Sequence, residues 1–271
     1  MQRTIVVLLT VLALHVAADD PPSSAVALVG DEAERFLREA VVVELEEFDN
    51  KGVTRPLKAT LDDGERRLHA VFKNIDTSTP KSRAANGRYF FNLKDSYRHE
   101  IASYELDKLL GLGMVPPTVE RRIGREVGSL QLWVEGSMTE WDRKKVEKLA
   151  PPDVSAWNDR ISTVKTYLQL IWDTDYNNIS NVIVDADFEV WKVDASRAFY
   201  ADAKLRREGS LTRFSRGFLE ALENLDPAEL NRALGPWLSK RQIETLWKRR
   251  DRILELAAER VTELGEETVL Y

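Results

Sequence analysis

The chain has 271 residues, of which 43% are hydrophobic and 31% are charged, and it contains no cysteine. A chain of this length and composition can bury a sizeable core, which excludes wholesale disorder and leaves one large domain or two lobes. The net charge of −6 gives no electrostatic case for a nucleic-acid partner, and the missing cysteines exclude disulfides and a lipoprotein anchor.

The first 18 residues have the pattern of a secretory signal peptide. Arg3 supplies a positive charge, residues 4–18 form an uncharged apolar run, and small residues precede Asp19. We therefore expect cleavage after Ala18 and an exported protein, periplasmic or secreted, with no membrane span after cleavage. The apolar run is short for a membrane span, and an uncleaved anchor is the alternative.

After the first 18 residues, we predict an N-terminal extension over residues 19–40, followed by an antiparallel sheet with one helix. The extension ends in a helix over 32–40. β-Branched runs between turn residues predict five strands, over residues 41–48, 53–61, 68–74, 118–123 and 129–134. The polar stretch 77–87 is expected to be a flexible loop. A helix over 97–110 starts after a cap at Asp95 or Ser96 and ends at Gly111.

The second half of the sequence is richer in helices. Apolar periodicity predicts helices over residues 156–172, 215–225, 227–234 and 239–264. Between the first two of these helices, short strands are expected over 181–184 and 188–193. We predict an α+β, bilobal fold, with a sheet-containing N-lobe over 41–137, a mainly helical C-lobe over 138–271, and a cleft between the lobes.

Polar residues at the ends of the short strands are the first candidates for a functional site. Asp175 lies in an acidic, asparagine-rich loop, Asn181 begins the first strand, and Asp194 follows the second. Carboxylate and amide oxygens suit a hard divalent cation, with a separate Asp left to orient a hydroxyl or water. The alternative is that these residues serve only as turn formers.

Four motifs resemble those of the atypical kinase-like superfamily, which includes phosphatidylinositol 3-/4-kinase-like and secretory-pathway kinase-like proteins. The likeness is greatest to the exported bacterial branch of that superfamily. The motifs are AVFK at 70–73, YRHEIASYELDKLLGL at 97–112, the run 175–184, and VDASRAF at 193–199. The resemblance implies a bilobal protein-kinase-like fold that uses ATP.

The resemblance also implies roles for the residues of these motifs. Lys73 would contact the α- and β-phosphates of ATP and be positioned by Glu100, although the two residues could also form only a surface ion pair. Asp175 would be the catalytic residue that faces the acceptor hydroxyl. Asn181 and Asp194 would hold Mg²⁺ or Mn²⁺ against the phosphates.

Two further parts of a nucleotide site are implied by the resemblance. Thr54, in the turn between the first two strands, would contact phosphate together with backbone amides. Gln131, Trp133 and Glu135 would belong to the hinge that contacts adenine, although core or hinge packing is the alternative role for Trp133.

Two departures from the superfamily pattern leave the activity open. Tyr176 follows Asp175, where these kinases usually have Arg or His, and Asn181 lies six residues after Asp175 rather than five. The sequence therefore allows two interpretations of a kinase-like chain, an active phosphotransferase with an unknown hydroxyl acceptor or an inactive pseudokinase that binds a ligand or partner. A third interpretation is a structural exported protein whose acidic loop binds Ca²⁺.

Overall fold

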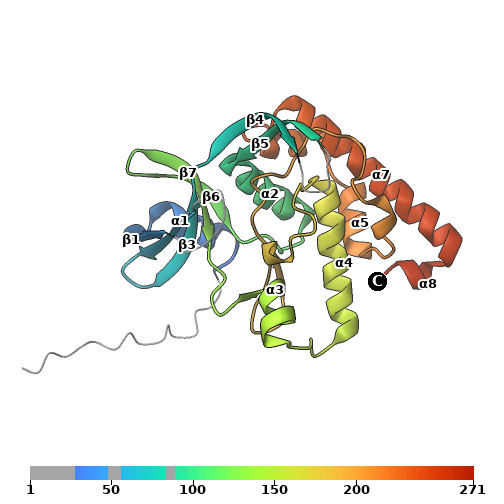
Figure 1. Ribbon diagram of the computed structural model, residues 1–271, viewed down its shortest axis with the longest axis horizontal. Coiled ribbons are helices and arrows are strands. Elements are labelled where there is room, and N and C mark those ends of the chain that lie inside the picture. The colour runs from blue at the N-terminus through green and yellow to red at the C-terminus, as the bar shows by residue number, and fades with distance from the viewer. Residues whose placement is uncertain (1–27, 48–55, 84–88) are drawn as a thin grey trace, which may run out of the picture.

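The computed structural model describes residues 28–47, 56–83 and 89–271, and these form two parts (Figure 1). A five-stranded antiparallel sheet lies on one side of the molecule, and most of the helices lie on the other. Helix α2 (Tyr97–Leu110) lies between the two parts and contacts strands of the sheet as well as helices of the second part. The α+β, bilobal architecture predicted from the sequence is confirmed.

The large sheet has the strand order β1-β2-β3-β7-β6, and all its neighbouring strands are antiparallel. Its strands are β1 (Val41–Glu47), β2 (Leu57–Asp62), β3 (Arg67–Lys73), β6 (Thr118–Ile123) and β7 (Glu126–Leu132). Alternate residues of β3, including Ala70 and Phe72, are buried on one face, against Phe36 and Leu37 of α1 (Gly30–Glu39). Because side chains alternate along a strand, the next residue, Lys73, points to the opposite face.

Residues 77–83 of the stretch expected to be a flexible loop instead belong to a hairpin, and residues 84–87 of that stretch lie outside the described residues. Strands β4 (Asp76–Arg83) and β5 (Tyr89–Ser96) pair in antiparallel fashion, with Thr79 opposite Leu93 and Lys81 opposite Phe91. The prediction was wrong because β4 is polar throughout and shows no apolar alternation. Its backbone nevertheless obtains hydrogen-bond partners from β5.

The second part contains a three-stranded sheet and the remaining helices, packed around a core of their own. The core includes Trp172, Phe199 and Phe218, all almost fully buried. Its elements are β8 (Met138–Thr139), α3 (Glu140–Asp142), η1 (Arg143–Glu147), α4 (Val154–Leu170), η2 (Ile179–Asn181), β9 (Val182–Val184), β10 (Val190–Lys192), η3 (Glu208–Ser210), α5 (Arg216–Glu223), α6 (Pro227–Leu234), α7 (Lys240–Leu264) and α8 (Glu266–Val269). Among the described elements, no helix has the length and apolar content needed to cross a bilayer.

The ends of α2 are fixed by the residues expected from the sequence. The Ser96 side chain caps the helix by accepting a hydrogen bond from the N–H of Arg98 at 3.3 Å. Gly111 ends it in the left-handed conformation, with φ of 62°. These caps place Glu100 in the first turn of the helix, on the side nearest Lys73.

Candidate active site

Three charged side chains from distant parts of the sequence meet in one cluster. Lys73 ends β3, Glu100 lies in the first turn of α2, and Asp194 follows β10. Lys73 Nζ lies 2.6 Å from Glu100 Oε1 and 2.8 Å from Asp194 Oδ1. The second oxygen of Glu100 accepts a hydrogen bond from the N–H of Ala195 at 2.9 Å. The structure thus brings together three of the residues singled out in the sequence.

Burial and charge set the protonation states in this cluster. Burial alone would lower the pKa of Lys73, but the carboxylates of Glu100 and Asp194 raise it above its ordinary value. Burial alone would raise the pKa of Asp194, but the Lys73 ammonium lowers it below its ordinary value. At neutral pH the lysine is therefore positive and Asp194 negative. Because Lys73 and Glu100 are both buried, their contact is not a surface ion pair.

Asp194 presents one carboxylate oxygen outward. Its backbone is in the left-handed region, with φ of 58°, a conformation that is uncommon for residues other than glycine and is often found at functional sites. Its side chain is 40% exposed. Lys73 occupies Oδ1, and within the described residues Oδ2 makes no hydrogen bond. This oxygen is available to an external ligand.

Lys192, which the sequence analysis missed, fixes the backbone around Asp194. Its side chain is almost fully buried, and its Nζ donates to the carbonyl oxygens of Val193 and Asp194. The same Nζ lies 3.0 Å from Asp173 Oδ2, which makes a buried ion pair. The strand alternation of β10 predicts only that Lys192 shares a face with Val190, and nothing in the sequence indicates its partner.

The two aspartates of the acidic loop differ in environment. Asp173 is buried, is paired with Lys192, and accepts a hydrogen bond from the N–H of Asp175 at 2.8 Å. The Asp175 side chain is 39% exposed and lies 3.9 Å from Arg197 Nη1. Burial and the neighbouring Asp173 raise the pKa of Asp175. Asp173 thus has a structural role, whereas the side chain of Asp175 is accessible to a substrate.

Asn181 lies beside the Asp194 segment. Its carbonyl oxygen accepts a hydrogen bond from the N–H of Val193 at 3.0 Å. Its side-chain Oδ1 accepts one from Asn178 Nδ2 at 2.9 Å, while its own Nδ2 is buried without a partner among the described residues. An amide oxygen has two lone pairs, so Asn181 Oδ1 retains one acceptor position.

The donors at this point fit a magnesium or manganese ion. Asp194 Oδ2 and the second lone pair of Asn181 Oδ1 are oxygen donors, which both ions prefer. In the part of the chain that the structure describes, His, Asp and Glu side chains form no group of three or more that could enclose a metal. A cation held here would complete its coordination with phosphate oxygens and water, as Mg²⁺ commonly does.

Of the four remaining predicted nucleotide contacts, three lie in or just after β7, where the hinge is expected, and one lies outside the described residues. Gln131 is buried within the sheet, opposite Val71 of β3, and its Nε2 donates to Thr118 Oγ1 at 2.9 Å. Trp133 and Glu135 follow β7 and line a cavity of about 230 Å³, opposite the turn between β9 and β10. Thr54 lies outside the described residues.

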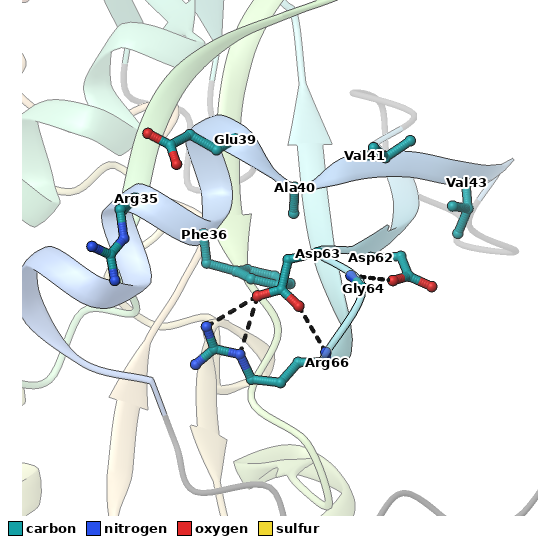
Figure 2. A pocket seen from close by; sticks show the side chains of 10 residues that line it. All are labelled: Arg35, Phe36, Glu39, Ala40, Val41, Val43, Asp62, Asp63, Gly64 and Arg66. Carbon is teal, nitrogen blue, oxygen red and sulfur yellow. Dashed lines mark hydrogen bonds and ion pairs between the residues drawn. The ribbon is translucent and has the colours of Figure 1, made fainter.

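A larger cavity, of about 570 Å³, lies away from this cluster. It is lined by residues of α1, β1 and the turn between β2 and β3 (Figure 2). Asp63 and Arg66 bond to each other across that turn, and Phe36 lies beside them. Since none of the candidate site residues lines this cavity, its volume says nothing about the site at Lys73.

The comparisons with known proteins support the fold. No protein-family model and no curated protein sequence matches the chain. Among solved structures, a Fam20 protein from hydra, solved with a sugar, matches with a TM-score of 0.62 and 15% sequence identity, covering 89% of this chain and 91% of that chain. The chain therefore has a kinase-like fold. At this level of sequence identity, the match shows the fold and not the activity.

Two other solved structures have lower scores. The proinflammatory kinase CtkA of Helicobacter pylori gives a TM-score of 0.44 at 12% identity, covering 77% of this chain and 95% of that chain. The Rio2 kinase of Chaetomium thermophilum gives 0.38 at 15% identity, covering 84% and 74% respectively. Because both scores lie below 0.5, the fold assignment rests on the hydra protein.

Proposed function

We propose that the chain is a phosphotransferase that uses ATP with Mg²⁺ or Mn²⁺ and transfers the γ-phosphoryl group to a hydroxyl of a protein, a lipid or a small molecule. The observation that carries the proposal is the cluster of Lys73, Glu100 and Asp194. A buried cation between two carboxylates, one of which keeps an open oxygen, is suited to bind a metal–nucleotide complex. We also propose, from the first 18 residues, that the protein is exported.

Each residue of the site has a distinct task in this reaction. Lys73 would hold the α- and β-phosphates, with Glu100 fixing its position. Asn181 and Asp194 would hold the cation, which neutralises phosphate charge when it is bound. The bond from the γ-phosphorus to the bridging oxygen breaks, a bond to the acceptor oxygen forms, and ADP leaves. Asp175 would accept the proton of the attacking hydroxyl, and its raised pKa favours that task.

One observation favours the second candidate, an inactive pseudokinase. Tyr176 does not turn toward Asp175, because its hydroxyl lies 2.8 Å from Ser210 Oγ. The loop from 173 to 181 contains no cationic residue. A site of this kind could bind the nucleotide without transferring phosphate.

Nucleotide binding is the first test. Thermal unfolding of the purified chain is measured with and without Mg²⁺ or Mn²⁺ and ATP. A ligand at about a hundred times its Kd stabilises a protein by roughly 2.7 kcal/mol, which is a shift of a few degrees for a chain of this size. Asp194→Asn should abolish the metal-dependent shift, since it removes the open carboxylate but leaves Lys73 paired with Glu100. The exposed Lys165→Ala is a control that should shift like the wild type.

Phosphate transfer is tested next, with labelled ATP and candidate acceptors. The hydra protein was solved with a sugar, so sugar hydroxyls are tested beside protein and lipid hydroxyls. Transfer that is lost in Asp175→Asn supports the phosphotransferase. Binding without transfer to any acceptor supports the pseudokinase. If no nucleotide shifts the unfolding temperature with either metal, the phosphotransferase and a nucleotide-binding pseudokinase are both rejected, and a pseudokinase that binds another ligand or a partner is what remains to be tested.

A further inference from the structure

Arg197 brings a further positive charge to the candidate site. It lies three residues after Asp194, and its side chain is 32% exposed. Its Nε donates a hydrogen bond to Asp95 Oδ2 at 2.8 Å, and its Nη1 lies 3.9 Å from Asp175 Oδ2. Its charge acts on Asp194 as well, because it helps to lower the pKa of that residue. The guanidinium is thus close to the proposed acceptor-facing carboxylate and to the proposed metal ligand.

Asp95 fixes the orientation of this guanidinium. Asp95 lies near the end of β5, directly before the cap of α2, and its side chain is mostly buried. Its Oδ1 is buried without a hydrogen-bond partner among the described residues. The contact between Oδ2 and Arg197 therefore offsets the cost of burying this carboxylate. The Nε edge of the guanidinium is therefore held toward Asp95, and Nη1 lies toward Asp175. Within the described ranges these Nη groups donate no hydrogen bond.

The neighbouring cations are occupied in other ways. Lys192 is buried against Asp173 and backbone carbonyls. Arg206 donates to the carbonyl oxygens of Asp173 and Thr174. Tyr176, next to Asp175, is uncharged and bonds away from it. Arg197 is thus the cation beside Asp175 that keeps open donors in the described part of the site.

We propose that Arg197 is a further catalytic residue, which binds the γ-phosphoryl group of ATP through its Nη groups while that group passes to the acceptor. The inference rests on the proposed function, since it concerns the same site. A guanidinium matches the oxygens of a phosphate with two parallel N–H donors, and negative charge on these oxygens must be neutralised during transfer. At 3.9 Å, the contact with Asp175 is too long for a hydrogen bond and is readily exchanged for a phosphate.

The test compares two nucleotides that differ only in the γ-phosphoryl group. Mg²⁺·ATP and Mg²⁺·ADP are titrated calorimetrically into the wild-type chain, Arg197→Gln and Arg197→Lys. Loss of a charge-assisted contact should weaken ATP binding by Arg197→Gln roughly 10- to 100-fold, with ADP binding unchanged within about twofold. Arg197→Lys keeps the charge without the paired donors and should fall between the wild type and Arg197→Gln.

A matched control separates this effect from a general loss of charge. Arg213 is exposed to a similar degree, 35%, and also pairs with an aspartate, Asp159, away from the site. Arg213→Gln should bind both nucleotides as the wild type does. Thermal unfolding without nucleotide checks that each variant is folded. If Arg197→Gln does not fold, the wild type is compared with Arg197→Lys alone.

The outcomes separate the inference from the proposed function. If the wild type binds ATP and the Arg197 variants bind ATP equally well, the inference is overturned and the proposed function stands. An equal loss of ATP and ADP also overturns it, because Arg197 would then act on the structure of the site. If the wild type binds neither nucleotide, the function and the inference fail together.

Discussion

Replacement of His99 by Asn should change the pH dependence of stability by an amount that follows from the structure. His99 precedes Glu100 in α2 and is almost fully buried. Its Nδ1 lies 2.8 Å from the carbonyl oxygen of Ser196, which can only accept, so Nδ1 carries the proton. Its Nε2 lies 3.1 Å from Gln242 Nε2 and accepts a hydrogen bond from it. The ring is therefore neutral, and a second proton on Nε2 would face a donor.

The size of the effect follows from the pKa. Burial lowers the pKa of His99 from 6.5 to about 4. The unfolded chain takes up a proton below about pH 6.5, while the folded chain does not until about pH 4. The contribution of His99 to stability is therefore fully present above pH 6.5 and is lost as the pH falls. Between pH 8 and pH 5 the loss amounts to about 2 kcal/mol.

Chemical denaturation of the wild type and of His99→Asn at pH 8 and pH 5 measures this loss. Asparagine does not titrate, so the free-energy advantage of the wild type over the variant should shrink by about 2 kcal/mol on going to pH 5. Effects of other titrating groups are common to both proteins and cancel in the difference. An advantage that is equal at the two pH values would refute a neutral, buried His99.

Two further variants test other buried charges. Burial raises the pKa of Asp107 from 3.8 to about 6, so the wild type loses stability as the pH rises. Chemical denaturation should therefore show that the stability of Asp107→Asn increases relative to the wild type by about 2 kcal/mol between pH 4 and pH 7. Lys192→Met should cost roughly 3–5 kcal/mol of unfolding free energy because it leaves Asp173 buried and unpaired. Adding Asp173→Asn should recover part of this loss, and a double variant no more stable than Lys192→Met would contradict the ion pair.

Elements with strong local signals could be predicted from the sequence. Helix α2 has a serine cap, a long apolar pattern and a terminal glycine, and its bounds agree with the expected residues 97–110. Local signals also place Lys73 at the end of a strand and Asp194 after one. Their meeting in space follows from the order of the elements, and that order resembles a known family. The β4–β5 hairpin lacked such a signal, because its stability comes from pairing and not from an apolar face.

Contacts between distant polar residues could not be predicted. Lys192 and Asp173 are 19 positions apart, and nothing in their surroundings distinguishes them from an exposed lysine and a turn aspartate. The contact between Arg197 and Asp95 spans 102 positions and depends on how β5 meets the segment after Asp194. Sequence patterns give the face on which a residue lies, whereas a buried ion pair depends on the packing of two elements.

The segment after Asp194 is held from two sides, and this explains how α7 can influence a site it does not line. From α2, His99 contacts the carbonyl oxygen of Ser196. From α7, Gln242 donates to the carbonyl oxygen of Phe199 at 3.0 Å, and the buried Arg249 donates to those of Tyr200 and Asp202.

Two residues of this segment, Asp194 and Phe199, have left-handed backbone conformations, with φ of 58° and 56°. Such conformations cost roughly 1–3 kcal/mol each and persist only where surrounding bonds impose them. The hydrogen bonds that α2 and α7 donate to carbonyl oxygens of this segment, from Ser196 to Asp202, supply that constraint. The open oxygen of Asp194 therefore keeps its position through contacts made by residues far away in the sequence, including those on α7.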